Sequence, residues 1–279
     1  MTGSSLITLP IILITFVLSY RGFKDHRLVD QYGFQVNKVL LYKDYKVLLT
    51  SGFFHVGWFH LIFNMFTFYF FSEGLGNLLG TLPLLIIYFS GLVGGNLLAL
   101  WMHRNHGDYR AVGASGAVYA LIFASIALMP GMRIGIFPLP ISIPTWIYGL
   151  LFLGFSMYII RSKRDNIGHE AHLGGALIGM LIALLFEPAA IRENYLPILA
   201  VLVPTLAFIF IIVYKPHLLM VDSLHFKETH KLTIDQRFNL EKQQQQLTID
   251  KILEKIHQRG MNSLTSEERK QLDAYSKSS

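Results

Sequence analysis

The sequence predicts an all-α membrane protein, a polytopic helical bundle with about seven spanning helices. Three observations predict this class. Only 15% of the 279 residues are charged, against about a quarter in soluble domains. Hydrophobic residues make up 52% of the chain, and the mean hydropathy is +0.44. Apolar stretches long enough to cross a bilayer recur throughout residues 1–214, which we take as one transmembrane domain.

The expected spans follow one another with mostly short connections. They lie at about 4–20, 56–77, 81–102, 114–130, 143–160, 169–187 and 195–214. The first apolar run has no basic segment before it and no small-residue cleavage site after it, so we interpret it as a span rather than a signal peptide. The long connection 21–54 mixes basic, aromatic and aliphatic residues, which predicts a segment that lies along the membrane interface.

Residues 215–279 are predicted to form a soluble helical tail. One amphipathic helix is expected to place Leu247, Ile252, Leu253 and Ile256 on one side and to end at Gly260. A second helix is expected to begin at Thr265, where Glu268 three positions later completes a capping box. We expect this tail to bind a partner or a regulator.

The composition also excludes some functions. The chain contains no cysteine, which excludes disulfides and thiolate chemistry. The net charge of +6 is explained by basic residues at the edges of the spans, so no nucleic-acid partner is expected, and the lipid bilayer is the expected surroundings. We expect neither a cofactor nor a metal.

Ser115 stands between glycines at the start of an apolar run, in the segment GASG. Small residues let helices approach closely, so Gly113 and Gly116 alone indicate only packing, and Ser115 alone could be structural. Tyr119 follows one helical turn later on the same face. Ser115 is therefore a candidate nucleophile that needs further support.

Two other segments provide groups that could act with Ser115. In GHEAHLGGALIG, Gly175 and Gly179 form a close-approach face that would bring His172 within hydrogen-bond reach of Ser115. In HVGWFHLIFNM, His60 and Asn64 are four positions apart and share one helix face. Polar and ionisable groups inside spans indicate a functional site.

Together these residues provide the groups needed for acyl transfer. Ser115 would attack a carbonyl, and His172 would accept its proton as general base. The backbone N–H of Ser115, the side chain of Asn64 and that of His60 would stabilise the oxyanion. Tyr119 could stack on the His172 imidazole. No aspartate is placed as a third member, so we predict a dyad.

The motifs HxxxN in the second span, GASG at the start of the fourth and AHLGGxxxG in the sixth resemble those of the rhomboid family of intramembrane serine proteases over residues 45–180. The resemblance implies a six-helix core plus one extra C-terminal span. It implies Ser115 as nucleophile, His172 as base, His60 and Asn64 as oxyanion donors, Tyr119 as stacking residue and Gly113 as the glycine two positions before the nucleophile. It also implies hydrolysis of peptide bonds in transmembrane protein substrates, without metal or ATP, in a bacterial cytoplasmic (inner) membrane.

Two positions depart from the family pattern. Tyr45 and Lys46 stand where the family has a Trp-Arg pair, and lysine lacks the forked contacts of arginine. Gly76 stands where the family has a glutamate, with Glu73 nearby. The missing glutamate concerns stability more than chemistry.

The orientation in the membrane is left open by the sequence. The resemblance implies that the active-site end of the spans, with connection 21–54, is extracytoplasmic. Basic residues crowd that connection, whereas the opposite loops carry little beyond Arg133 and Arg192. The positive-inside rule therefore predicts the reverse orientation.

Three alternatives remain beside an active protease. The first is an inactive rhomboid-like protein that binds membrane helices, against which the presence of both dyad residues argues. The second is a metal transporter lined by His55, His60, His169 and His172. The third, a zinc protease, needs HExxH, but HEAH places its histidines only three positions apart.

Overall fold

The computed structural model describes residues 5–135, 142–162 and 168–214, together with residues 252, 255, 256, 264, 265, 268, 269 and 272 of the tail. The chain divides into two compact units, Met1–Phe226 and Lys227–Ser279. The boundary expected at residue 214 differs from this division, and residues 215–226 lie outside the described ones.

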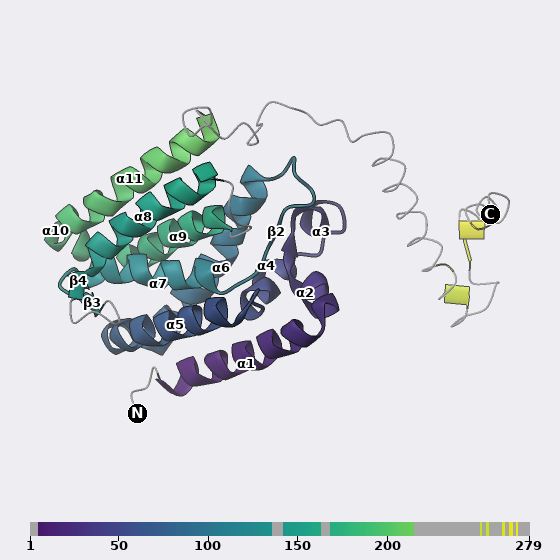
Figure 1. Cartoon of the computed structure of the whole chain (residues 1–279), viewed down its shortest axis with the longest axis horizontal. Helices are drawn as coiled ribbons and strands as arrows, with labels where there is room; N and C mark the ends of the chain where they lie inside the picture. Colours follow the sequence, from purple (N-terminus) through teal and green to yellow (C-terminus); the bar gives the residue numbers. More distant parts are fainter. Residues whose placement is uncertain are drawn as a thin grey trace. The chain divides into compact units, whose positions relative to one another are not determined.

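Long helices occupy all seven stretches that were expected to span the membrane (Figure 1). They are α1 (Ser5–Lys24), α5 (Trp58–Leu79), α6 (Thr81–Met102), α7 (Ser115–Leu128), α8 (Thr145–Ser162), α9 (His169–Phe186) and α11 (Tyr195–Tyr214). Within the described residues, α1, α6, α9 and α11 are each long and apolar enough to cross a membrane. A fifth span results if α5 is joined across a 99° bend to the short helices before it, so the expectation of seven spans is supported for four or five.

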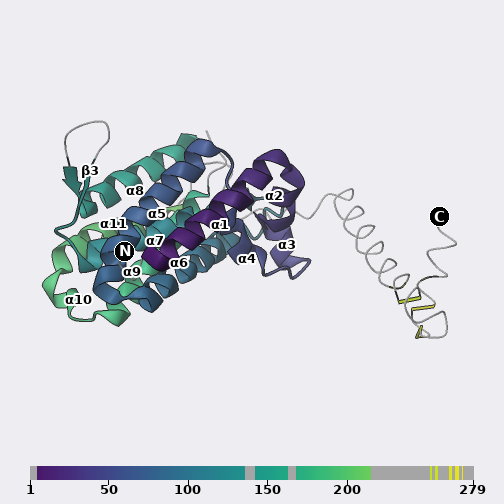
Figure 2. The same cartoon turned by 90° about the horizontal axis from the view of Figure 1, so that it is seen from below.

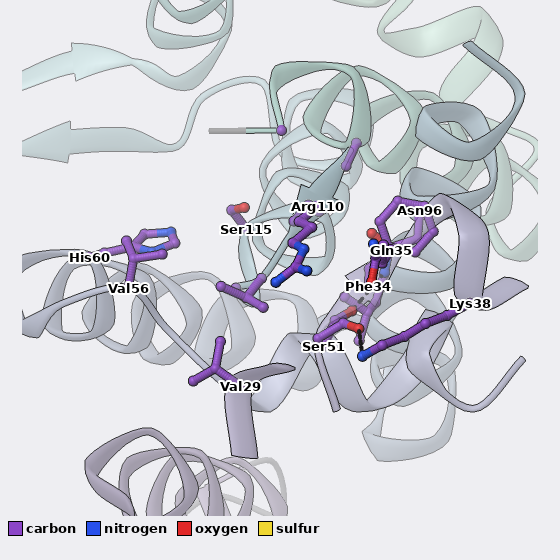
Figure 3. A pocket seen from close by; sticks show the side chains of 18 of the residues that line it. Val29, Phe34, Gln35, Lys38, Ser51, Val56, His60, Asn96, Arg110 and Ser115 are labelled. Atoms are coloured by element: carbon purple, nitrogen blue, oxygen red, sulfur yellow. Dashed lines mark hydrogen bonds between the residues drawn. The ribbon is translucent and has the colours of Figure 1, made fainter. Parts of the chain in front are cut away.

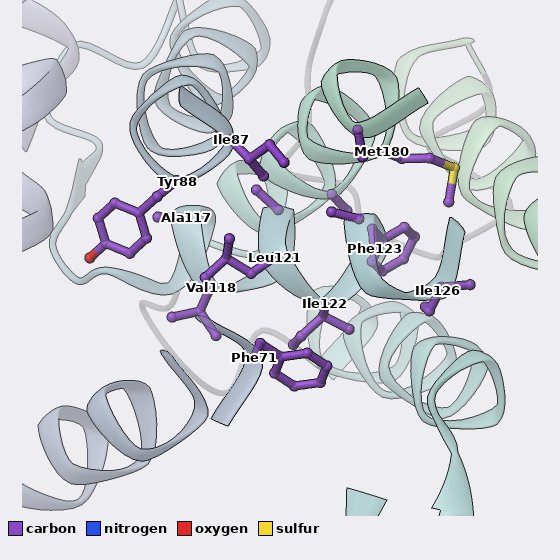
Figure 4. Packing of buried hydrophobic residues seen from close by; sticks show 14 of the residues in the cluster. Phe71, Ile87, Tyr88, Ala117, Val118, Leu121, Ile122, Phe123, Ile126 and Met180 are labelled. Carbon is purple, nitrogen blue, oxygen red and sulfur yellow. The ribbon is translucent and has the colours of Figure 1, made fainter. Parts of the chain in front are cut away.

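Helix α7 lies at the centre of the bundle. Its residues from Ala120 to Ala127 are all buried, and Figure 4 shows Leu121, Ile122 and Phe123 of α7 among buried side chains of neighbouring helices. With 14 residues it is about 21 Å long, shorter than the hydrocarbon core of about 30 Å. This helix is therefore too short to cross such a core from side to side.

Small residues let α6, α7 and α9 meet backbone to backbone. A side chain at Gly175 would overlap the Gly116 carbonyl, and one at Gly179 would overlap the backbone of Ala120. A side chain at Gly95 of α6 would overlap the carbonyl of Ala171. The close-approach face expected at Gly175 and Gly179 is thus the contact between α9 and α7.

Connection 21–54 is more than a surface strip. Past the end of α1 it forms α2 (His26–Tyr32), α3 (Val36–Leu40), α4 (Val47–Thr50) and the 3₁₀-helix η1 (Ser51–Phe53). Phe34, Val36 and Val47 are buried in a hydrophobic cluster that includes Ala99 of α6 and Ala171 of α9. We call residues 25–54 the cap. Figures 1 and 2 both show α2, α3 and α4 gathered at one end of the bundle.

Two short ribbons of strand accompany the helices, which the all-α expectation did not include. β1 (Phe34–Gln35) pairs antiparallel with β2 (Arg110–Ala111), with Phe34 opposite Ala111. This ribbon ties the cap to the segment that leads into Ser115. β3 (Arg133–Gly135) pairs with β4 (Ser142–Pro144) near the other end of the bundle (Figure 2).

At the end of the bundle away from residues 25–54, a side chain forms a hydrogen bond with the C-terminal end of α7. The short α10 (Ala190–Glu193) precedes Asn194, whose side-chain amide donates to the Ala127 carbonyl at 2.8 Å. The last carbonyls of a helix lack partners within it, so this bond satisfies one of them. It also fixes the start of α11 beside the end of α7.

In the tail unit, the capping box expected at Thr265 and Glu268 is present. The Thr265 N–H donates to Glu268 Oε2 at 2.7 Å, and the Glu268 N–H donates to Thr265 Oγ1 at 3.3 Å. Lys255 pairs with the same carboxylate at 2.7 Å. Ile252 and Leu264 are buried together, with Ile256 and Leu272 packed against them, whereas Leu247, Leu253 and Gly260 lie outside the described residues.

Candidate active site

The structure brings Ser115 and His172 into direct contact. Ser115 is the first residue of α7, and His172 lies in the first turn of α9. The Ser115 hydroxyl and His172 Nε2 are 2.6 Å apart, so the hydroxyl can donate to the imidazole. The contact of Gly175 with Gly116 brings the two helices close enough for this bond.

No carboxylate completes a triad within the described part of the chain. His172 is buried, and its Nδ1 atom has no hydrogen-bond partner among the described residues. Rings enclose the imidazole instead: the Tyr119 ring centroid lies 4.7 Å away and that of Phe152 5.8 Å away. Phe152 stacks on Tyr119 at 3.6 Å. The sequence did not single out Phe152, because it is one apolar residue in an apolar span.

Gly113 has a backbone conformation that favours glycine, with φ +131°. A Cβ at Gly113 would lie 2.6 Å from His60 Cε1 and 3.0 Å from His60 Nε2. Glycine is therefore needed both for the backbone and for the approach of the His60 ring. His60 and Gly113 line the same cavity as Ser115 (Figure 3).

Asn64 is placed differently from His60. It is buried one turn further along α5, and its amide donates to the His60 carbonyl at 2.8 Å. Asn64 is not among the described residues that line the cavity. One of its two amide hydrogens is thus used within its own helix.

A chain of hydrogen bonds that the sequence did not reveal holds the turn before Ser115. The Ala114 N–H donates to His55 Nε2 at 3.3 Å, and His55 Nδ1 lies 3.0 Å from Ser19 Oγ. The Ser19 hydroxyl donates to the Phe53 carbonyl at 3.0 Å. Because Nε2 accepts, Nδ1 must carry the proton and donate to Ser19, which fixes the tautomer.

The same turn is held from a second side. The Gly113 N–H donates to the Ser51 carbonyl at 3.0 Å. The side-chain amide of Asn96 donates to Ser51 Oγ at 3.0 Å and to the Leu48 carbonyl at 2.8 Å. Helix α1, through His55, and helix α6, through the cap, therefore both position the turn. The only sequence signal for His55 was its place five residues before His60.

The cavity beside Ser115 has a volume of about 560 Å³ and is mainly apolar. Phe34, Leu92 and Val56 contribute apolar side chains to its lining. Arg110 and Asp30 stand at its outer part as an exposed ion pair, with 2.6 Å between the guanidinium and the carboxylate. Figure 3 shows His60, Ser115 and Arg110 around this space.

A buried polar cluster surrounds the start of α9. Glu170 lies 3.3 Å from His103 Nε2 and accepts a hydrogen bond from the Tyr109 hydroxyl at 3.2 Å. The rings of His103 and Tyr109 stack at 3.7 Å. Burial and the neighbouring Glu170 carboxylate hold the pKa of Tyr109 well above its usual value. This cluster joins α9 to the end of α6. Its α9 member, Glu170, lies two positions before His172.

The four histidines of the transporter alternative form two separate pairs. The ring centroids of His55 and His60 lie 4.9 Å apart, and those of His169 and His172 lie 5.3 Å apart. Among the described residues, no three His, Cys, Asp or Glu side chains form a group that could hold a metal ion. The described histidines thus do not form a common ligand set.

Two family models match the chain. The Rhomboid domain model matches residues 43–189, which includes every expected site residue. A second model, described as a family of unknown function (DUF6576), matches residues 232–278 of the tail.

Named relatives are similar over the same part of the chain. RHOMBOID-like protein 12, mitochondrial, of Arabidopsis thaliana is 30% identical over 48% of this chain and 44% of the relative. Rhomboid protein 1, mitochondrial, of Saccharomyces cerevisiae is 27% identical over 56% and 47%. Presenilin-associated rhomboid-like protein, mitochondrial, of Mus musculus is 31% identical over 48% and 36%.

The alignments span less than half the length of each of these relatives. The similarity to these rhomboid proteins supports a multi-pass membrane protein. Because each of the three is named as a mitochondrial protein, they give no support to the expected bacterial inner membrane or to a specifically bacterial form.

Proposed function

The chain belongs to the rhomboid family, since the family's domain model matches more than half of its residues, and from this we propose that it is an intramembrane serine protease. Its substrates would be transmembrane proteins, cut in or near their membrane helices. The single observation that carries the proposal is the 2.6 Å hydrogen bond between Ser115 Oγ and His172 Nε2.

In the proposed reaction, Ser115 Oγ attacks the carbonyl carbon of the scissile peptide bond while His172 Nε2 accepts the hydroxyl proton. The tetrahedral intermediate then collapses as the imidazolium gives this proton to the leaving amine, which departs with the C-terminal product. An acyl group remains on Ser115. His172 next takes a proton from water, the hydroxide attacks the ester, and Ser115 recovers its proton as the acid product leaves.

The oxyanion would form at the start of α7. The Ser115 N–H is one donor, since the first N–H groups of a helix have no partner within it. The His60 edge that faces Gly113 would provide a second donor from Nε2. Asn64 would contribute its remaining amide hydrogen after a side-chain rotation. Tyr119 and Phe152 would hold the imidazole in the orientation that its unpartnered Nδ1 does not fix.

The length of α7 supports a substrate bond cut below the membrane surface. Because α7 is about 9 Å shorter than the hydrocarbon core, one of its ends lies at membrane depth. We propose that the end below the membrane surface is the N-terminal end of α7, because polar groups line the cavity beside Ser115 there. Irregular backbone at such depth is tolerated where it lines a cavity, as the turn at Gly113 does.

The seven-span form, its location in a bacterial inner membrane and a regulatory or partner-binding tail are also proposals. The seven helices at the expected positions support the first of these. A separate family model over residues 232–278 supports an independent module in the tail.

The deciding experiment offers a fluorescent transmembrane peptide to the purified full-length chain. We expect cleavage by the wild type, none by Ser115→Ala, and wild-type cleavage by Ser125→Ala. Ser125 is a matched control, because it lies in the same helix and its buried hydroxyl has no hydrogen-bond partner among the described residues. Cleavage that survives Ser115→Ala would contradict the dyad, and cleavage abolished by a chelator would indicate a metal enzyme.

The inactive rhomboid-like alternative makes a different prediction for the wild type. It predicts no cleavage and no reaction of Ser115 with a fluorophosphonate, which labels activated serines. A labelled Ser115 in the wild type and no label in His172→Ala would exclude that alternative.

A further inference from the structure

The first turn of α9 carries His172 but is weakly held by its own residues. Gly168, the residue that begins the helix, has no side chain to accept from the free N–H groups of this turn. The His172 N–H donates to the Gly168 carbonyl at 3.3 Å, a long bond. Because helix ends fray, the position of the imidazole depends on what else holds this turn.

Glu170 belongs to the same turn, and its carboxylate reaches the segment that leads to Ser115. Its Oε2 atom accepts a hydrogen bond from the Tyr109 hydroxyl at 3.2 Å, across 61 positions of the chain. Tyr109 lies shortly before Ser115 in the sequence, and Glu170 shortly before His172. This bond therefore ties together the two parts of the chain that carry the proposed nucleophile and base.

Tyr109 is a fixed partner for Glu170, because contacts hold both its backbone and its ring. Its carbonyl accepts from the Val36 N–H at 3.2 Å, and its own N–H donates to the His106 carbonyl at 3.0 Å. Its ring stacks on His103 at 3.7 Å. The cap and the end of α6 thus both fix the tyrosine.

The start of α9 also packs closely on the same segment. A Cβ at Gly168 would lie 3.0 Å from the Tyr109 hydroxyl oxygen and 3.3 Å from Ala111 Cβ. Neither Tyr109 nor Glu170 is among the described residues that line the cavity. An effect of these two side chains on the reaction must therefore pass through the position of His172.

Stability alone does not explain a carboxylate at this place. Glu170 and His103 are both buried, and Glu170 Oε1 lies 3.3 Å from His103 Nε2. Taking a carboxylate out of water is costly, and a buried ion pair is often no more stabilising than apolar residues of similar volume. What the two contacts of Glu170 do provide is one fixed arrangement of α9 against α6 and Tyr109.

We propose that Glu170 is a positioning residue, which holds the first turn of α9, and with it His172, against the segment that leads to Ser115. It acts beside the contact of Gly175 with Gly116, which sets the spacing of the two helices further along α9. The effect on the reaction rests on the proposed protease function, whereas the tether itself does not.

Two substitutions of Glu170 separate its hydrogen bonds from its charge. Glu170→Leu removes both contacts. In Glu170→Gln the side-chain carbonyl can accept from Tyr109, and the amide can donate to His103 Nε2 when the His103 proton is on Nδ1. We expect Glu170→Leu to lower kcat for a transmembrane peptide about 10²-fold with KM unchanged, and Glu170→Gln to recover most of the rate. The rate of Ser115 labelling by a fluorophosphonate should follow kcat.

Tyr109→Phe removes only the hydroxyl and keeps the ring on His103. We expect a loss in kcat of about 10-fold, and no further loss when Tyr109→Phe is added to Glu170→Leu. Thr8→Val is the matched control, because it also removes one buried hydroxyl, which donates to Ser72 Oγ at 3.1 Å between α1 and α5. Thr8→Val should keep the wild-type kcat.

Thermal unfolding and hydrogen exchange distinguish positioning from a structural role. Equal losses of kcat in Glu170→Leu and Glu170→Gln, or in Tyr109→Phe and Thr8→Val, would overturn the proposal. So would lower thermal stability in Glu170→Leu with a wild-type kcat.

Hydrogen exchange of residues 169–173 tests the tether without any substrate. We expect it to be faster in Glu170→Leu and Tyr109→Phe than in the wild type and in Glu170→Gln, and equal exchange in all four would overturn the tether. If the wild type is neither labelled nor active, the protease function fails, and the exchange rates still decide whether Glu170 holds the start of α9.

Discussion

The Nε2 atom of His172 lies 2.6 Å from the Oγ atom of Ser115, although 57 positions separate the two residues in the chain. If the two act as one unit, removing either should have the same effect as removing both. We predict that His172→Ala, Ser115→Ala and the double variant each lower kcat by about 10⁴-fold or more. His26→Ala, in an exposed position of the cap, is the control. Additive losses in the double variant would contradict a dyad.

Asn64→Ala should lower kcat on the order of 10²-fold with little change in KM, because one oxyanion donor is lost while the Ser115 N–H remains. Thr67→Ala is a matched control. Thr67 lies in the same helix, is also buried, and makes the same kind of bond, from Oγ1 to the Phe63 carbonyl at 2.7 Å. Equal losses in both variants, or a complete loss in Asn64→Ala with the fold intact, would mean that the oxyanion hole lies elsewhere.

Gly113→Ala should abolish most of the activity. Its φ of +131° costs a residue with a side chain about 1–3 kcal/mol, and the added carbon would push against the His60 ring. Gly131→Ala is the control, since its side chain would meet open space. Steady-state cleavage, with thermal unfolding as the measure of stability, separates a lost site from a lost fold. A wild-type kcat in Gly113→Ala would show that activity does not require the His60 ring to lie this close to the backbone at position 113.

His55 should act as a positioning residue for the turn before Ser115. His55→Leu leaves the buried Ala114 N–H without its acceptor, which costs about 1–3 kcal/mol, and we expect slower reaction of Ser115 with a fluorophosphonate. In His55→Gln the side-chain carbonyl can accept from Ala114 and the amide can donate to Ser19, so this variant should recover much of the rate. If His55 had only a structural role, His55→Leu and His55→Gln would lose the same amount of stability, and His55→Gln would not recover the rate of reaction with the fluorophosphonate.

The tail should lose stability in acid through Glu268. Hydrogen bonds from Lys255 and from Thr265 lower the pKa of Glu268 to about 2. A carboxyl with a lowered pKa stabilises the folded form above its unfolded pKa of about 4.5, and this contribution is lost as the pH falls towards 2. The protection of residues 252–272 against hydrogen exchange, taken relative to the intrinsic exchange rate at each pH, should therefore fall over that interval.

Glu268→Gln should make exchange in the tail fast already at neutral pH and remove most of its dependence on acid. Glu267→Gln removes the same charge one position earlier and serves as the control. Identical behaviour of the two variants would contradict a specific role for the capping box.

The positions of the long helices could be predicted from the sequence, because apolar runs and their polar ends are local properties. The partners of Ser115 could be proposed for the same reason, since GxxxG and the HxxxN spacing are short patterns. The contact of Gly175 with Gly116 shows why the small-residue pattern was informative. The pattern predicts a helix face without bulky side chains on α9, and α7 presents a similar face at Gly116.

What could not be predicted depends on contacts between distant segments. His55 was considered only as a metal ligand, because nothing in its neighbourhood points to Ser19 or Ala114. The pairing of Glu170 with His103 was missed because 67 residues separate them. The cap was expected as a surface strip, since the sequence does not reveal that Phe34 and Val47 bury themselves against α6 and α9.

The contact between Gly175 and Gly116 has a consequence for how the protein tolerates change. The spacing between nucleophile and base is set by main chain against main chain, with no side chain as a spacer. Repacking elsewhere in the bundle, by mutation or by a different lipid, can alter stability while leaving this spacing the same. A single methyl group at Gly175 would instead overlap the Gly116 carbonyl and push the two helices apart, so this position should tolerate no larger residue.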